Sequence, residues 1–276
     1  MEKLLFGTAG IPISAEPRNY HNALHQLVKM GLGCMEMEFV HGVNMNAATQ
    51  AEVKELSSEL DLVMTAHAPY YINLNAQEQD KLEASIKRIL DTARVASAVG
   101  GYSITFHGAY YMGGDKKAIN RLVISRISDI VETLNSEGIK IWIRPELTGK
   151  ATQWGDLDEL IEISKEIDMV LPCIDFAHLH ARTVGLYNTY DEFAGVLERI
   201  GSEVGDYALQ NFHAHVAGIN YGPKGEKNHL IFSDSDFNYS DLIKALKDFN
   251  VKGAIICESP NLEGDALVMQ ELYSSL

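Results

Sequence analysis

The amino-acid sequence predicts a (β/α)8 barrel that forms a single domain over residues 1–276. Short strand-like apolar runs alternate with longer segments of helical periodicity, and eight such pairs fill the chain. No linker, low-complexity segment or shift in composition marks a domain boundary. A doubly wound open sheet is disfavoured because Gly7 and Gly10 lead directly into Ile11-Pro12, so the first turn lacks a dinucleotide-binding glycine pattern.

The expected elements follow from their periodicity. The expected strands are Lys3–Gly7, Cys34–Phe39, Leu62–Ala66, Ser103–Phe106, Lys140–Arg144, Met169–Ile174, Gln210–Val216 and Ala254–Cys257. The expected helices include Gln77–Val99, Lys116–Glu137, Asp156–Ile167, Tyr239–Asn250 and Gly264–Leu276. Leu82, Ile86 and Ile89 recur at helical spacing, and Asp156 is a suitable first residue for its helix.

Composition indicates a protein with an ordinary hydrophobic core. Hydrophobic residues make up 46% of the 276 positions, so disulfides are not required for stability. Cys34, Cys173 and Cys257 are far apart and form no Cys-x-x-Cys pair, which favours buried thiols in a reducing compartment. No apolar run approaches the ~18 residues of a membrane span. We therefore expect a cytoplasmic protein without a membrane partner.

The formal net charge of −15 bears on the partner. An acidic chain is poorly suited to broad, non-specific binding of nucleic acid, which usually requires a basic surface. Divalent cations held by carboxylates and histidines can nevertheless invert the potential of one cleft. The charge therefore disfavours a DNA substrate without excluding it.

Potential metal ligands follow most of the expected strands. In a (β/α)8 barrel the reactive groups lie at the C-terminal ends of the strands. These ends carry His67, His107, Glu146, Asp175 with His178, His213 with His215, and Glu258, and His229 lies in the loop after the seventh strand. A hydrogen-bonded structural role is common for any one of them, but their convergence at six strand ends is typical of a metal site.

The ligand types narrow the metal and the chemistry. Imidazoles mixed with carboxylates and no thiolate suit Zn²⁺, with Mn²⁺ as an alternative. Seven or eight ligands exceed the capacity of one tetrahedral ion, so two or more ions bridged by a carboxylate are expected. Such a site suits in-line displacement at phosphorus.

Several of these residues lie in strings that resemble the endonuclease IV family, the apurinic/apyrimidinic (AP) endonucleases among the xylose-isomerase-like TIM barrels. The strings are His67-Ala-Pro-Tyr70-Tyr-Ile-Asn-Leu, Phe106-His107, Glu146, Asp175-Phe-Ala-His178, His213, His229 and Glu258-Ser-Pro. The match runs in order from the third strand to the eighth, and the first string is its most specific part.

The resemblance implies a cluster of two or three zinc ions and a DNA partner that contains abasic sites. His67, His107 and Glu146 would hold one ion; Glu146, Asp175, His213 and Glu258 the second; His178 and His229 the third. The implied reaction cleaves the phosphodiester 5′ to the abasic site through a metal-bound hydroxide. Glu258 and Glu146 would be the catalytic carboxylates, and Tyr70 would line the pocket for the extruded nucleotide.

Three features depart from the family pattern or leave an assignment open. Lys227 stands two positions before His229, where the family has an Asp. His213 and His215 face the same side of one strand, and we favour His213 as the ligand, with His215 and Lys227 contacting substrate. The loop after the second strand, 41–45, has no Arg or aromatic residue to enter a DNA duplex.

Two other functions remain open. A sugar isomerase or epimerase of the same barrel superfamily would need one ion, held by Glu146, Asp175, His213 and Glu258, and its glutamates would move protons between sugar carbons. The acidic charge favours this alternative. A one-ion site, however, leaves four histidines without a role: His67, His107, His178 and His229. The third hypothesis is a catalytically silent barrel that binds a partner through the old site.

Overall fold

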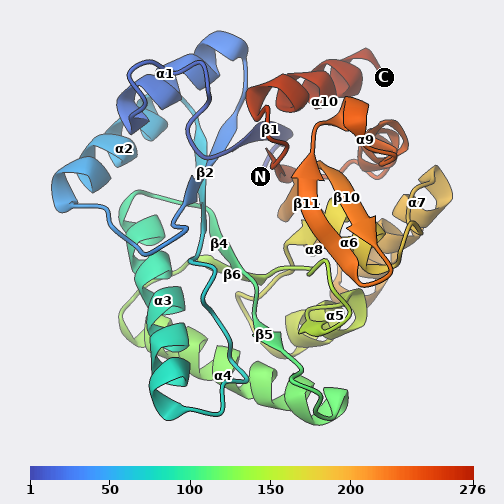
Figure 1. The fold of residues 1–276 in the computed structure, drawn as a ribbon. Helices are drawn as coiled ribbons and strands as arrows, with labels where there is room; N and C mark the ends of the chain where they lie inside the picture. Colours follow the sequence, from blue (N-terminus) through green and yellow to red (C-terminus); the bar gives the residue numbers. More distant parts are fainter.

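The protein folds as a parallel β-barrel enclosed by helices, as the sequence predicts. The computed structural model describes residues 1–276 and joins eight strands in the order β6-β4-β3-β2-β1-β12-β9-β8 (Figure 1). These strands are β1 (Leu4–Ala9), β2 (Cys34–Glu38), β3 (Val63–His67), β4 (Ser103–Phe106), β6 (Trp142–Pro145), β8 (Ile174–Asp175), β9 (Phe212–Val216) and β12 (Gly253–Cys257).

The barrel closes between β6 and the segment that precedes β8. The N–H of Leu171 donates to the carbonyl of Ile143 at 3.3 Å, and that of Cys173 donates to Pro145 at 3.0 Å. The expected strand Met169–Ile174 is regular only at its end because Met169 has a φ of 67° and Pro172 has no N–H to donate. An irregular segment therefore completes the hydrogen bonding of the barrel.

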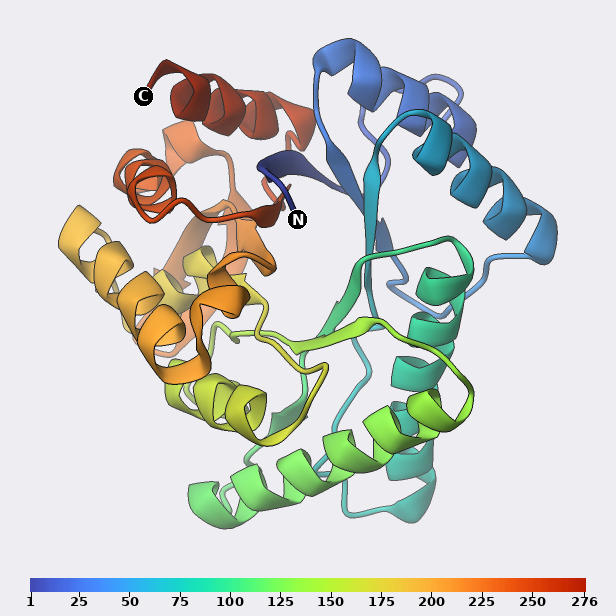
Figure 2. The same cartoon turned by 180° about the vertical axis from the view of Figure 1, so that it is seen from behind.

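Helices cover the outside of the sheet on all sides (Figure 2). They are α1 (Tyr20–Met30), α2 (Ala47–Glu59), α3 (Gln79–Ala98), α4 (Lys116–Ser136), α5 (Leu157–Glu166), α6 (Phe176–Arg182), α7 (Tyr190–Arg199), α8 (Asp206–Leu209), α9 (Tyr239–Asp248) and α10 (Glu263–Ser275), with short turns at Ile200–Val204 and Phe232–Asp234. The expected helices are confirmed with small differences at their ends. At the start of α5, Asp156 and Glu159 form a capping box. No helix is both long and apolar enough to cross a membrane.

Alternate residues of the strands face two different environments. A core cluster of 66 buried residues joins strand positions such as Met35, Met37 and Met64 to the inner faces of the helices. The intervening positions face the barrel interior, where Glu36, Thr65 and other polar side chains contact one another. Apolar packing thus holds the helices on the sheet, whereas polar contacts fill much of the barrel.

Two small antiparallel strand pairs extend from the C-terminal side of the barrel. One joins β5 (Ala109–Tyr110) to β7 (Gln153–Trp154), which follows α4 and β6 in the chain, and the other is the hairpin of β10 (Gly218–Gly222) and β11 (Gly225–Leu230). The β10–β11 hairpin, orange in Figure 1, lies in front of the barrel in that view. Neither strand pair was expected from the sequence, and both carry residues that line the site described below.

We predict that Gly7→Ala strongly destabilises the fold. A Cβ at Gly7 would lie 1.9 Å from the carbonyl oxygen of Cys34 on the neighbouring strand, and backbone cannot move aside as a flexible side chain can. We expect the free energy of unfolding, measured with urea, to fall by about 3 kcal/mol or more. The control is Gly195→Ala in α7, where an added Cβ has no heavy atom within 4 Å. This control should gain about 0.5–1 kcal/mol. Equal effects of the two substitutions would contradict the prediction.

Candidate metal centre

A fully buried carboxylate, Glu146, lies at the centre of the strand ends. Its oxygens are 3.1 Å from Nε2 of His67, 3.2 Å from Nε2 of His107 and 3.1 Å from Nδ1 of His178. Burial raises the pKa of Glu146, but the nearby rings of His107 and His215 outweigh it and hold that pKa well below its usual range. Glu146 is therefore an ionised group surrounded by imidazoles.

The tautomer of His67 is set by a backbone contact. Its Nδ1 lies 2.7 Å from the carbonyl oxygen of Ala68, which can only accept a hydrogen bond, so Nδ1 carries a proton. The neutral ring then directs the lone pair of Nε2 at the carboxylate of Glu146. That arrangement requires a second proton or a cation between the two atoms. Without metal, burial lowers the pKa of His67 but Glu146 outweighs it and raises the pKa to about 10.

A second group of ligands surrounds Nδ1 of His215. This nitrogen is 3.3 Å from Glu258, 3.5 Å from Glu146 and 4.0 Å from Asp175. Nδ1 of His215, Oε1 of Glu146 and Oδ2 of Asp175 are all buried and have no hydrogen-bond partner. Buried polar atoms rarely remain unpaired, so nitrogen and oxygen donors left in this way fit a divalent cation such as Zn²⁺.

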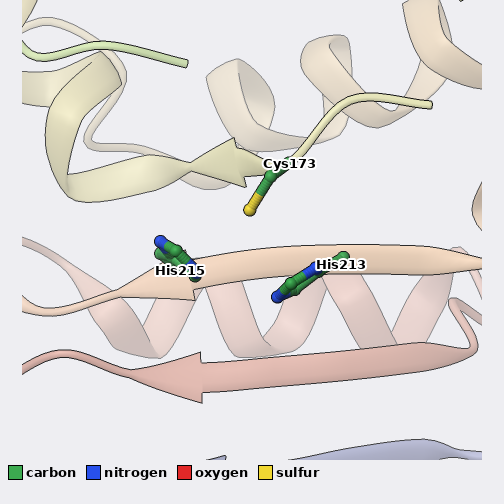
Figure 3. Close-up of side chains that lie close together, drawn as sticks. All are labelled: Cys173, His213 and His215. Atoms are coloured by element: carbon green, nitrogen blue, oxygen red, sulfur yellow. The ribbon is translucent and has the colours of Figure 1, made fainter. Parts of the chain in front are cut away.

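The structure places His215, and not His213, with these carboxylates. His213 lies one inward-facing position earlier on β9, where its Nδ1 is 3.0 Å from Oγ of Ser103 and its Nε2 is 3.1 Å from Glu36. Cys173 faces both rings from the segment before β8 (Figure 3). His215 therefore occupies the place expected for the ligand His213, and His213 lies deeper in the barrel, below the centre.

A third group forms around His178 and His229. Their ring centroids are 5.5 Å apart, and Asp175, His178 and His229 each bring one donor atom within reach of a common ion. Asp175 also fixes the start of α6, because its Oδ1 accepts the backbone N–H of His178 at 2.6 Å. The buried Nε2 of His229 has no hydrogen-bond partner. The sequence-predicted ligands other than His213 therefore meet at one centre.

Glu226, which was not among the expected ligands, faces the third group. Its Oε2 is 3.6 Å from Nε2 of His178. The backbone N–H of Glu226 donates to the carbonyl of Gly149 at 3.0 Å, and a Cβ at Gly149 would lie 2.6 Å from Glu226. The absence of a side chain at Gly149 lets β11 approach the loop after β6.

Lys227 is exposed and does not line the cavity, so the structure gives no support to its expected contact with substrate.

Two further acids reach the barrel interior from β2, and neither was expected to be a site residue. Glu36 is fully buried beneath His215, and Glu38 lies close to Glu258 at the mouth. Oε1 of Glu38 is buried without a hydrogen-bond partner, and burial raises the pKa of this carboxyl to about 8. Metal-free Glu38 is thus largely protonated at neutral pH.

The three groups open into a cavity of about 390 Å³. Its lining consists of His67, Tyr70, His107, Tyr110, Glu146, Lys150, Gln153, His178, Glu226, His229 and Glu258. Tyr70, expected to contact substrate, is 54% exposed at the mouth. Arg182 binds the carbonyls of Thr148, Lys150 and Gln153, so it holds the loop that supplies part of the lining. A larger cavity of about 560 Å³, near Lys3 and Tyr273, contains none of these ligands.

Comparison with known sequences identifies the family to which this protein belongs. The sequence matches the family described as Xylose isomerase-like TIM barrel over residues 24–273. The protein belongs to that family. An uncharacterized protein of Methanocaldococcus jannaschii is 44% identical over 273 residues, 99% of this chain and 98% of that one. A probable endonuclease 4 of Methanosphaera stadtmanae is 30% identical over 174 residues, 59% of this chain and 60% of that one.

Solved structures with the same fold include an endonuclease and an epimerase-like protein. Endonuclease IV from Thermus thermophilus has a TM-score of 0.73 at 17% identity, covering 97% of this chain and 98% of that one. A D-tagatose 3-epimerase-like protein has a TM-score of 0.72 at 20% identity, covering 97% and 96%. At these identities the two structures establish the fold alone.

We predict that Glu38 makes the metal-free protein less stable as pH rises. The pKa of the Glu38 carboxyl is 4.5 in the unfolded chain and about 8 in the folded chain. At pH values between these two, the unfolded chain has released the carboxyl proton and the folded chain retains it. Unfolding of the chelator-treated wild type should therefore become easier relative to Glu38→Gln across this pH window, by at most about 1.4 kcal/mol per pH unit. Chemical denaturation at several pH values measures the difference. The exposed Glu55→Gln serves as control and should track the wild type. A Glu38→Gln difference that is constant with pH would contradict the prediction.

Proposed function

We propose that this protein is a metal-dependent phosphodiesterase that cleaves DNA 5′ to abasic sites. One observation carries the proposal. Glu146, Asp175, His215 and Glu258 already form a complete single-ion set, yet four more imidazoles face the same centre. These are His67, His107, His178 and His229. Only a site with more than one ion gives all of them a function.

The ligands divide among three ions. His67, His107 and Glu146 would hold the first, and Glu146 with Asp175, His215 and Glu258 the second. His178 and His229 would hold the third, with Glu226, 3.6 Å from His178, as a further donor. Nitrogen and oxygen donors without thiolate suit Zn²⁺, with Mn²⁺ as the alternative. When bound, the ions supply Lewis acidity and neutralise charge on the phosphate and on the departing oxygen.

A carboxylate of the protein accepts the proton of the attacking water. Glu258 is the carboxylate best placed to orient the attacking water and accept its proton, because its side chain is 13% exposed and lines the cavity. Its two oxygens approach His215 at 3.3 Å and His229 at 3.8 Å, which fixes the orientation of the carboxylate. Glu146 has no exposure and belongs to two of the ligand groups, so it would bridge two ions and would not act as the proton acceptor.

The mouth of the cavity suits an extruded sugar phosphate. Tyr70 and Tyr110 are 54% and 39% exposed at the rim, where their rings can pack against a deoxyribose. Lys150 is the only Lys or Arg in the lining, so it can contact a phosphate. A nucleotide without a base is also the easiest to extrude from a duplex.

A sugar epimerase is the second candidate. The group Glu146, Asp175, His215 and Glu258 is sufficient for one ion, and Glu146 and Glu258 would then exchange protons with a sugar. The net charge of −15 favours this candidate because a neutral sugar is not repelled by it. The experiment must therefore offer both substrates.

We predict that the zinc-loaded protein nicks duplex DNA at an abasic site and that chelator abolishes nicking. Glu258→Gln should lower the nicking rate about 10²-fold or more, because it removes the proton acceptor. A gel assay with a synthetic abasic duplex measures the rate, and the exposed Glu55→Gln is the matched control. Nicking that survives both chelator and Glu258→Gln would contradict the mechanism. Epimerisation of a ketose without nicking would establish the second candidate instead.

We predict that the third ion depends on Glu226 and His178. Glu226→Gln and His178→Asn should each lower the zinc content by one ion per chain and slow nicking, because His178 belongs to one ligand group only and Glu226 lies 3.6 Å from it. Inductively coupled plasma spectrometry gives the stoichiometry. Lys227→Gln, one residue along β11 and outside the cavity, should keep the wild-type content. Unchanged zinc in both test variants would remove the third site.

A further inference from the structure

A buried chain of polar side chains lies directly beneath the centre. Oε1 of Glu36 is 2.8 Å from Nε2 of His215, the ring nitrogen opposite to the one that faces the metal ligands. Oε2 of Glu36 accepts the hydroxyl of Thr65 at 2.7 Å and lies 3.1 Å from Nε2 of His213. All four side chains belong to residues with no measurable exposure.

The outer end of this chain is also fixed. Nδ1 of His213 is 3.0 Å from Oγ of Ser103 on β4. Glu36, Thr65, Ser103 and His213 come from four different strands, β2, β3, β4 and β9, so the contacts span the barrel interior. Oε1 of Glu36 and Nε2 of His215 are both buried and make no hydrogen bond of regular geometry, so the 2.8 Å approach between them is the close polar contact that the two atoms share.

The contact between Glu36 and His215 decides which ring nitrogen can bind metal. A carboxylate accepts hydrogen bonds and cannot donate, so the proton of a neutral His215 ring is favoured at Nε2. The lone pair of Nδ1 is then directed at the carboxylates of Glu146 and Glu258. A carboxylate bonded to the distal nitrogen also increases the basicity of a ligating imidazole.

We propose that Glu36 is the positioning residue of the metal centre, and that Thr65 and His213 hold its carboxylate so that Nδ1 of His215 faces the ion. This assigns functions to Glu36 and His213 that do not include contact with metal or substrate. The inference rests on the proposed metal centre but not on the choice between DNA and sugar, because His215 belongs to the single-ion set in both cases.

A second explanation of the same cluster is a deep ion held by Cys173, His213 and His215, whose donor atoms lie within 4.8 Å of one another (Figure 3). The two explanations predict different metal contents. In the positioning scheme Cys173 binds nothing, whereas a deep ion would have a thiolate ligand.

The test is the affinity of the centre for zinc, measured by competition with a chromophoric chelator. Glu36→Gln keeps the shape of the side chain but removes its charge, and we expect a 10–100-fold loss of affinity for one ion without loss of an ion at saturating zinc. The matched control is Glu159→Gln, another buried Glu, which accepts the Tyr111 hydroxyl and lies outside the centre. It should lower thermal stability and leave zinc affinity unchanged.

Two further readouts keep the inference falsifiable if Glu36→Gln does not fold. Thr65→Val removes one hydrogen bond to Glu36 and should lower zinc affinity in the same direction by a smaller factor. In the zinc-loaded wild type, ¹⁵N NMR should show the His215 proton on Nε2, in a downfield, slowly exchanging signal. A proton on Nδ1 would overturn the assignment.

The Cys173→Ser variant distinguishes the positioning scheme from the deep ion. Cys173→Ser should leave the zinc content unchanged, and the cobalt-substituted protein should show no thiolate charge-transfer band. Loss of one ion or of such a band in Cys173→Ser would establish the deep ion and overturn the positioning scheme. Zinc affinity unchanged in both Glu36→Gln and Thr65→Val would also overturn it. Protein that binds no zinc at all would refute the proposed function itself, which is a distinguishable result.

Discussion

The centre of this protein depends on one buried carboxylate. Glu146 has no exposed surface, and the imidazoles of His67, His107 and His178 each approach its oxygens within 3.2 Å. An ionised carboxylate in such a place is costly unless positive charge is nearby. Protons on the rings or divalent ions between the groups can supply that charge. The Ala68 carbonyl fixes a proton on Nδ1 of His67, so Nε2 faces Glu146 through a second proton in the metal-free protein or through a bound cation.

The barrel scaffold explains how so many polar groups can share one interior. The 66-residue cluster outside the sheet supplies the main apolar core, so the inward-facing positions are not all needed for hydrophobic packing. Only a small cluster of Leu5, Cys34, Ala254 and Ile256 fills the interior with apolar groups. Glu36, Thr65 and His213 occupy positions at a similar depth. The structure thus separates the main apolar core, on the outer face of the strands, from the candidate metal ligands on the inner face.

Most of the fold and much of the centre could be predicted from the sequence. Apolar runs that end in His67, Glu146 or Glu258 identify strand ends, and parallel strands bring such ends together. The choice between His213 and His215 could not be made, because residues two apart on a strand share a face and only their depth in the barrel distinguishes them.

Other residues were missed for different physical reasons. Glu36 and Glu38 alternate with Met35 and Met37, and this alternation was itself a signal, since a barrel strand covered by helices has no solvent-facing side. Glu226 depends on a hairpin whose register shifts between Asn220 and Tyr221, and on the close approach to Gly149. Sequence spacing alone pointed to position 227, and a register shift of that kind is visible only in three dimensions.

Because the chain is acidic, the substrate that the cavity can bind depends on how many metal ions it holds. The cavity is lined by Glu146, Glu226 and Glu258 with Lys150 as its only Lys or Arg, within a chain of net charge −15. A phosphodiester would be repelled by that lining in the absence of ions, whereas three divalent ions would make the cavity a local anion site. Binding of DNA would then depend on short-range contact with the centre, because the protein has no excess of basic residues to attract the backbone from a distance. A neutral sugar would need no such inversion and only one ion. The number of ions held by the four additional histidines therefore determines which substrate the cavity can accept.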